Sequence, residues 1–151
     1  MVTALPDSEI LVRQWCLSKT SITNLLGTRI ATNLPNEPTL PFLVITLLGG
    51  SIDDSEALVG RADFQFDAYA GNWGGDNTKN KPDYQTAFNV ANTVLQEAFA
   101  KQDNQITSSG AAVGYIYGFT VTSNVRRIDE EGIGLARYSF DATMTYRSNS
   151  E

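Results

Sequence analysis

Strict two-residue alternation over two segments constrains this chain more than any other feature. In residues 61–70 apolar side chains take every second position, and residues 135–147 repeat the pattern. Successive side chains of a β-strand point to opposite faces of the sheet, so each segment is predicted to be a strand with one buried and one open face. The residues predicted to face the core are Phe64, Phe66, Ala68, Tyr138, Phe140, Ala142, Met144 and Tyr146.

Two further strands are predicted from apolar content and spacing. Residues 42–50, FLVITLLGG, are apolar up to a glycine pair, which predicts a central strand covered on both faces and ended by Gly49-Gly50. In residues 113–125 one face is expected to carry Val113, Tyr115, Tyr117, Phe119 and Val121, with Gly114 and Gly118 on the other. Chain order favours two antiparallel hairpins, one from each consecutive pair of strands.

Helical patterns occupy the rest of the chain. Two short helices are predicted in the first 26 residues, starting at Pro6-Asp7 with Ile10, Leu11 and Trp15 on one face and ending at Gly27. A helix of about 16 residues is predicted after Pro82, in its first turn, because apolar residues then recur at three- and four-residue spacing. The sequence therefore predicts an α+β fold in a single domain over residues 1–151: a mostly antiparallel four-stranded sheet with one long helix packed on a face and short N-terminal helices.

Charge and composition narrow the class of function. The chain has 17 acidic and 11 basic residues, a net charge of −6, which argues against a surface that binds nucleic acid. Solubility is the simpler account of the excess acid. The one cysteine, Cys16, excludes an internal disulfide, and no apolar run or N-terminal signal predicts a membrane span or export. These features predict a protein of a reducing, aqueous compartment.

The sequence contains no combination of residues that strongly indicates catalysis. The chain has no histidine, so the commonest general bases and zinc ligands are missing. Asp53, Asp54 and Glu56 offer oxygen ligands, but a solvated or partner-facing loop is the more economical interpretation. The polar strand faces likewise explain Asp63, Asp67 and Asp141 better than paired catalytic acids do. We therefore predict that the protein is not an enzyme and uses no cofactor or metal.

Three polar loops favour assembly: residues 49–60, 71–81 and 126–134. The third loop carries adjacent basic and acidic groups, which suits head-to-tail contact between identical subunits, or a mixed-charge turn in solvent. A tryptophan in the second loop either packs on its own chain or anchors a partner. The candidate contact residues are Asp53, Asp54, Glu56, Trp73, Lys79, Lys81, Arg126, Arg127, Asp129, Glu130 and Glu131.

The order of these segments resembles the tail terminator, or tail completion, proteins of long-tailed bacteriophages. The likeness covers about Asp7 to Arg147. In that family an N-terminal helix is followed by a "G-R-I" segment, here Gly27-Thr28-Arg29-Ile30 with one residue inserted, and a proline-rich link leads into Pro41-Phe42-Leu43-Val44-Ile45. A strand of the type Phe64-Gln65-Phe66-Asp67-Ala68-Tyr69-Ala70 follows, then the helix, an acidic turn, and a closing strand from Arg137 to Tyr146-Arg147. A long loop, NWGGDNTKNK, stands where the family usually turns quickly into the helix.

This resemblance implies a structural virion protein. Such proteins form a six-membered ring that caps the tail tube, ends its polymerisation and joins tail to head. The implied partners are further copies of the chain, the major tail tube protein and a head-completion or neck protein. DNA would pass through the ring without specific binding, and no membrane is involved. The implied location is the head-proximal end of the tail, after assembly in the host cytoplasm.

Two other interpretations stay open. A neck connector or a baseplate-side tail protein has a similar architecture, and fold alone does not separate these roles. A small acid-dependent hydrolase or ligand-binding domain is the alternative from a different class.

Overall fold

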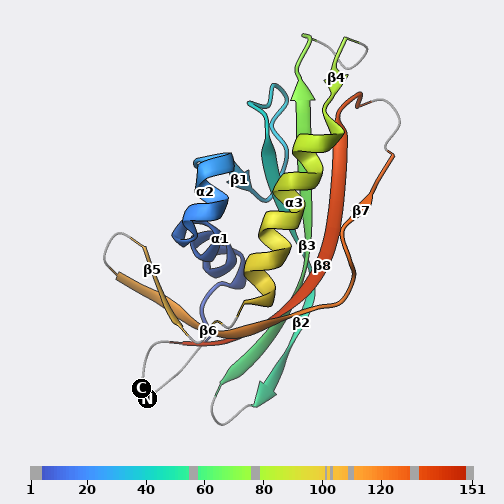
Figure 1. Ribbon diagram of the computed structural model, residues 1–151. Helices are drawn as coiled ribbons and strands as arrows, with labels where there is room; N and C mark the ends of the chain where they lie inside the picture. Colours follow the sequence, from blue (N-terminus) through green and yellow to red (C-terminus); the bar gives the residue numbers. More distant parts are fainter. Residues whose placement is uncertain are drawn as a thin grey trace.

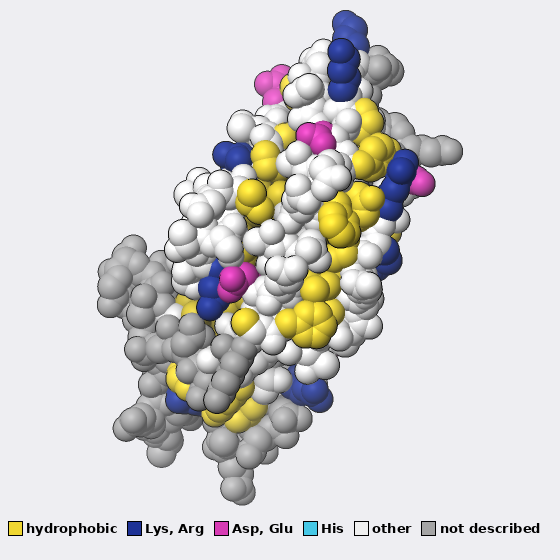
Figure 2. Space-filling model, viewed as in Figure 1, with side chains coloured by type: hydrophobic (Ala, Val, Ile, Leu, Met, Phe, Trp, Pro, Cys, Tyr) yellow, Lys and Arg dark blue, Asp and Glu magenta, His cyan; other side chains and the backbone are white. Residues whose placement is uncertain are grey.

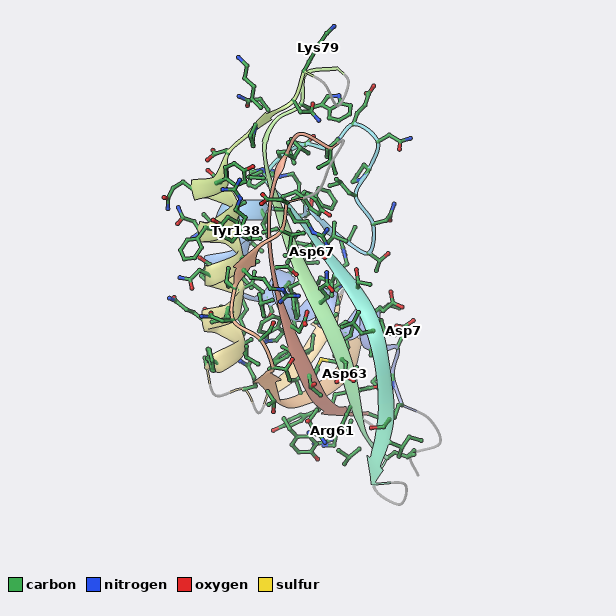
Figure 3. The ribbon with its side chains drawn as sticks, turned by 90° about the vertical axis from the view of Figure 1, so that its right-hand side faces the viewer. Asp7, Arg61, Asp63, Asp67, Lys79 and Tyr138 are labelled. Atoms are coloured by element: carbon green, nitrogen blue, oxygen red, sulfur yellow. The ribbon has the colours of Figure 1, made fainter. Side chains whose placement is uncertain are left out.

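The computed structural model describes residues 5–54, 58–75, 79–100, 102, 104–108, 111–129 and 133–148. Its helices are α1 (Ser8–Ser18), α2 (Thr20–Leu26) and α3 (Tyr84–Phe99). Its strands are β1 (Ile30–Ala31), β2 (Phe42–Asp54), β3 (Val59–Asn72), β4 (Lys81–Pro82), β5 (Asn104–Ser108), β6 (Ala111–Val121), β7 (Arg126–Arg127) and β8 (Ala136–Arg147). The three helices lie on one face of the sheet, whose other face is turned to the viewer in Figure 3 (Figures 1 and 3).

The strands form one mixed sheet in the order β1-β2-β3-β8-β6-β5, with β4 on β3 and β7 on β8. Only the short β1–β2 pair is parallel among these described strands. The predicted α+β class is confirmed, because the four predicted strands are β2, β3, β6 and β8 and the long helix α3 packs on β3 and β8. Both predicted hairpins are present, and β3 pairs with β8 to join them.

The main core lies between the helices and the sheet. Phe66 and Phe140, from neighbouring strands, stack with ring centres 4.8 Å apart, and Trp15 of α1 packs 4.5 Å from Phe119. The indole N–H of Trp15 donates to Gln102 Oε1 at 2.9 Å, so its one polar group is satisfied. Burial of each such aromatic stabilises the fold by roughly 1.5–3 kcal/mol. No helix of the described part is long and apolar enough to cross a membrane.

Helix starts follow local capping. Asp7 caps α1 by accepting from the backbone N–H of Glu9 and Ile10, and Asp83 caps α3 by accepting from Thr86 N–H.

Two details of the helix prediction are wrong. Pro82 lies in β4 before the helix, because Asp83 takes the capping position, and Ile10 is 52% exposed because α1 turns it away from the core.

Strand β2 differs from its prediction beyond Ile45. Its first part is covered on both faces, with Leu43 and Ile45 in the main core and Phe42 and Val44 in a second cluster with Tyr69. The glycine pair does not end the strand, which continues to Asp54 after a register shift between Leu47 and Gly49. Three apolar side chains between Thr46 and Asp54 are exposed: Leu47, Leu48 and Ile52. Gly50 serves close packing, since a Cβ there would lie 2.7 Å from Arg61 O on β3.

The predicted faces of β6 are correct only for its second part. Ile116 is fully buried, and a Cβ on Gly114 would lie 3.0 Å from Leu11 of α1, so even-numbered residues face the core there. A register shift between Ile116 and Gly118 then reverses the alternation and turns Phe119 inward. Tyr117 sits at this bulge and is 43% exposed.

Candidate functional site

Two of the three predicted contact loops meet at one end of the sheet, which is at the top of Figure 1 and is called the upper end below. β4 pairs with β3 and closes residues 71–81 into a hairpin. Asn80 ties this hairpin to the 126–134 turn, because its Nδ2 donates to Ile133 O at 2.8 Å. Its Oδ1 accepts from Gly74 N–H at 2.8 Å, so both ends of the Asn80 amide are used.

A hollow of about 310 Å³ opens at this end, beside Trp73. The half-buried Trp73 packs on its own chain and forms one wall. The lining residues are Leu34, Pro35, Asn36, Pro38, Tyr69, Trp73, Ile133 and Leu135. Most of its lining side chains are apolar, and Asn36 adds a polar group.

Both arginines of the 126–134 turn have partners within the chain. Arg126 lies 3.6 Å from Asp141 and donates to Ser123 Oγ at 2.7 Å. Arg127 donates to Asp129 Oδ1 at 2.8 Å and lies 3.8 Å from the ring centre of Tyr84. The hydrogen bond to Asp129 raises the pKa of Arg127, so its charge is fixed at all working pH values. Glu130 and Glu131 lie outside the described residues.

The two lysines also lie at the upper end. Lys79 is at its tip (Figure 3), and Lys81 lies in β4 opposite Asn72; both are exposed. They add positive charge to the 71–81 hairpin.

The acidic segment that precedes β3 is at the opposite, lower end. Asp53 and Asp54 belong to β2, where Asp54 pairs with Val59, and Glu56 lies outside the described residues. The predicted loop over residues 49–60 is therefore wrong for residues 49–54 and 59–60, because backbone pairing between β2 and β3 includes these residues. The structure thus brings two predicted loops together and keeps the third apart from them.

The open sheet face holds an ion pair that the sequence interpretation missed. Asp67 on β3 is 3% exposed, and its Oδ1 accepts from Arg137 Nε of β8 at 3.0 Å. Gln65 Nε2 donates to both oxygens of Asp67, at 3.1 and 3.2 Å. The two-residue alternation of residues 61–70 predicted that Asp67 lies on the polar face of the strand, exposed to solvent. The available signal was an acid and a base on two predicted strands, Asp67 and Arg137, but the pairing of those two strands was not predicted.

Charges on this open face nearly balance. Its described arginines are Arg61, Arg126, Arg137 and Arg147, and its described acids are Asp63, Asp67 and Asp141. Ser139 Oγ and Asp141 Oδ1 are buried without a partner among the described residues. Ser139 has neither a histidine nor a lysine in hydrogen-bond contact in the described part, so no activated nucleophile is assembled here.

Cys16 and the acids give no metal site or reactive thiol in the described part of the chain. Cys16 is fully buried, and burial raises the pKa of its thiol far above the ordinary value, which keeps it protonated. No group of three His, Cys, Asp or Glu side chains among the described residues is placed to hold a metal ion.

Comparisons with known proteins identify a fold. No family model and no curated protein matches the chain. Among solved structures, it matches a chain of a particle described as "Virion of native gene transfer agent (GTA) particle", with a TM-score of 0.53, 16% identity and 92% of each chain covered. At this identity the likeness extends to the fold, and this protein shares the fold of that virion chain over nearly its whole length.

Proposed function

We propose that this protein is a structural component of a phage-like virion. The single observation that carries the proposal is the shared fold with a chain of the gene transfer agent virion, which covers 92% of both chains. The order of segments described above, which resembles tail terminators, supports the same class independently of that likeness. The protein acts by assembly, without catalysis, cofactor or metal.

Within that class we propose the tail terminator role. Copies of the chain form a six-membered ring at the head-proximal end of the tail, which ends tube polymerisation and offers a surface to the head-completion or neck protein. The major tail tube protein is the partner on the other side. The net charge of −6 suits a channel through which DNA slides, because acidic surfaces repel phosphates.

The two ends of the molecule provide two separate contact surfaces for this role. The upper end carries the hollow beside Trp73 and the 126–134 turn, and the lower end carries Asp53 and Asp54. A protein that joins two different partners needs two such surfaces. We propose that Asp53, Asp54 and Glu56 contact the last tube ring or a neighbouring copy.

Deletion of the gene from its phage or particle producer, followed by negative-stain imaging of the lysate, tests the proposal. Overlong tubes without heads, beside filled heads, are expected. Tails of normal length that do not join heads would replace the terminator role with that of a neck connector, and missing tails would indicate a baseplate-side protein. Intact particles would contradict a structural role.

A further inference from the structure

The sheet has two free edges, one on each long side. The first is β2 beyond Val44, because β1 pairs only with Leu43 and Val44 and no other described strand pairs with β2 on that side. The second is the end of β6, because β5 pairs with β6 only as far as Ile116 and no described strand continues along that side. In Figure 3, β2 runs along the right-hand side of the sheet and the chain from β6 to β7 along the left-hand side.

The strand register places these two edges at the same height. Four rows of paired residues run across β2, β3, β8 and β6 and end at the edges: Leu47 with Val121, Gly49 with Thr120, Gly50 with Phe119, and Ser51 with Gly118. The first and third rows pass through the core residues Phe64 and Ala62, so they lie on the face that the helices cover. The other two rows pass through Asp63 and Arg61 on the open face (Figure 3).

Strand direction also suits a contact between the two edges. Each pair from β2 through β3 and β8 to β6 is antiparallel, so β2 and β6 run in opposite directions. Rotation of a second copy about an axis parallel to the strands preserves these directions. The β2 edge of one copy would then lie antiparallel to the β6 edge of the next copy, with covered rows beside covered rows and open rows beside open rows.

Both edges lack the residues that usually keep an exposed edge from pairing. Residues 46–52, TLLGGSI, and 117–125, YGFTVTSNV, contain no Lys, Arg, Asp, Glu or Pro. Soluble proteins commonly protect an edge with such residues, because its unpaired N–H and C=O groups are a template for another strand. Each edge has a register shift, at Leu48 and at Tyr117, but residues 49–52 and 118–121 pair regularly and contain the three lower rows in full.

The β2 edge is also incompletely covered on its helix side. Leu47 and Ile52 are exposed there, and a hollow of about 390 Å³ lies between this part of β2 and Leu5, the residue that leads toward α1. An added strand would cover these apolar side chains. The residue that the register places opposite Gly50 is Phe119, which is only partly buried within its own chain, and Gly50 has no side chain to obstruct it.

We propose that the free β2 edge of one copy pairs with the free β6 edge of the next copy, so that neighbouring sheets continue into one another around the ring. Residues 49, 50 and 51 lie opposite residues 120, 119 and 118 in an antiparallel ladder. The contact joins two different surfaces of the chain, and such heterologous contacts close into a ring when the rotation permits. Two β2 edges paired about a two-fold axis would instead close a dimer and leave both β6 edges open. The inference rests on the proposed function and names the contact between neighbours in the ring.

A disulfide across the predicted ladder tests the contact. Gly49→Cys and Thr120→Cys are combined in one chain and oxidised in purified particles. A Cβ on Gly49 meets nothing within 4 Å, and Thr120 is exposed, so both positions accept the change. Within one copy the two positions are three strand spacings apart, roughly 14 Å, which is too far for a disulfide. The native Cys16 gives little background because it is fully buried with a raised pKa.

The matched control combines Thr46→Cys with Thr120→Cys. Thr46 is exposed and lies on the same edge, but two rows away from Gly49. The expected result is a ladder of disulfide-linked dimers and larger oligomers that exceeds the control by about tenfold, because directly opposed residues alone meet disulfide geometry. Equal yields in the two variants, or no ladder, would overturn the proposal. Dimers formed by Gly49→Cys alone would replace it with a two-fold contact between β2 edges.

Charge placed on either edge gives a second test that needs no cross-link. Leu48→Lys and Thr120→Lys each add a positive charge to an exposed edge position, and Asn89→Lys adds the same charge to the exposed surface of α3. All three are expected to keep the wild-type unfolding curve. The two edge variants should lower tail completion by about tenfold or more, since each places an unpaired charge in the contact, whereas Asn89→Lys should complete tails normally. Normal completion by both edge variants would reject the contact.

The gene-deletion phenotype separates this inference from the proposed function. Overlong tubes after deletion, with no disulfide ladder in assembled particles, would retain the terminator role and reject this contact. A ladder together with tails of normal length that do not join heads would retain the contact and reject the terminator role.

Discussion

The Asp67–Arg137 ion pair joins the two central strands on the face that the helices do not cover. Its carboxylate is nearly inaccessible and receives Arg137 together with two hydrogen bonds from Gln65. A buried pair contributes little against an apolar replacement of both partners, but removal of one partner leaves an uncompensated charge. We therefore expect the pair to favour the observed register of β3 against β8 more than it adds stability.

Arg137→Ala is expected to lower the free energy of unfolding by about 3 kcal/mol, because Asp67 stays buried without its counter-charge. Urea denaturation measures the change. Arg61→Ala on the same sheet face is the matched control and should stay within about 0.5 kcal/mol of wild type, since Arg61 is exposed. Equal losses in the two variants would contradict the role given to the pair.

At the scale of elements, β2 shows how two adjacent glycines serve different purposes. A Cβ on Gly50 would lie 2.7 Å from the backbone oxygen of Arg61, whereas a Cβ on Gly49 would meet nothing within 4 Å. Gly50→Ala should destabilise the protein by about 1–3 kcal/mol through overpacking against backbone. Gly49→Ala should be neutral or stabilising by up to about 1 kcal/mol, because alanine costs less chain entropy than glycine. Thermal unfolding of the two variants tests this; a larger loss for Gly49→Ala would refute it.

The N-terminal cap of helix α3 is expected to make the stability of the protein depend on pH. Hydrogen bonds from the side chain and backbone of Thr86 lower the pKa of Asp83 from its ordinary 3.8. Because the pKa of Asp83 is lower in the folded protein than in the unfolded chain, the ionised cap stabilises the folded state at pH values above the ordinary pKa. This contribution is lost as the pH falls through the lowered pKa. The melting temperature of wild type should therefore exceed that of Asp83→Asn at pH 7, and the difference should vanish in strong acid. A difference independent of pH would show that the charge of Asp83 is not involved.

At the scale of the whole molecule, the proposed contact surfaces lie at the two ends of an elongated molecule, whose outline Figures 1 and 2 show. Replacement of Asp53, Asp54 and Glu56 by serine should leave the unfolding curve unchanged and weaken tail completion, because these acids are proposed to contact a partner. Complementation of the deleted gene, scored as the fraction of tails joined to heads, measures the effect. Asp129→Ser, Glu130→Ser and Glu131→Ser together remove the same charge and serve as the comparison. Normal completion with the first triple variant would contradict its assignment.

The sequence by itself determined the types and order of the main elements. Alternation in residues 61–70 and 135–147, the spacing after Asp83 and the cap at Asp7 each act over a few residues, so a single chain segment carries the information. Tertiary structure decided what depends on a neighbouring strand: the bulge at Tyr117, the continuation of β2 through Gly50, and the loops that meet through Asn80. Periodicity gives the face of a strand, but backbone hydrogen bonding between distant strands sets where that face reverses.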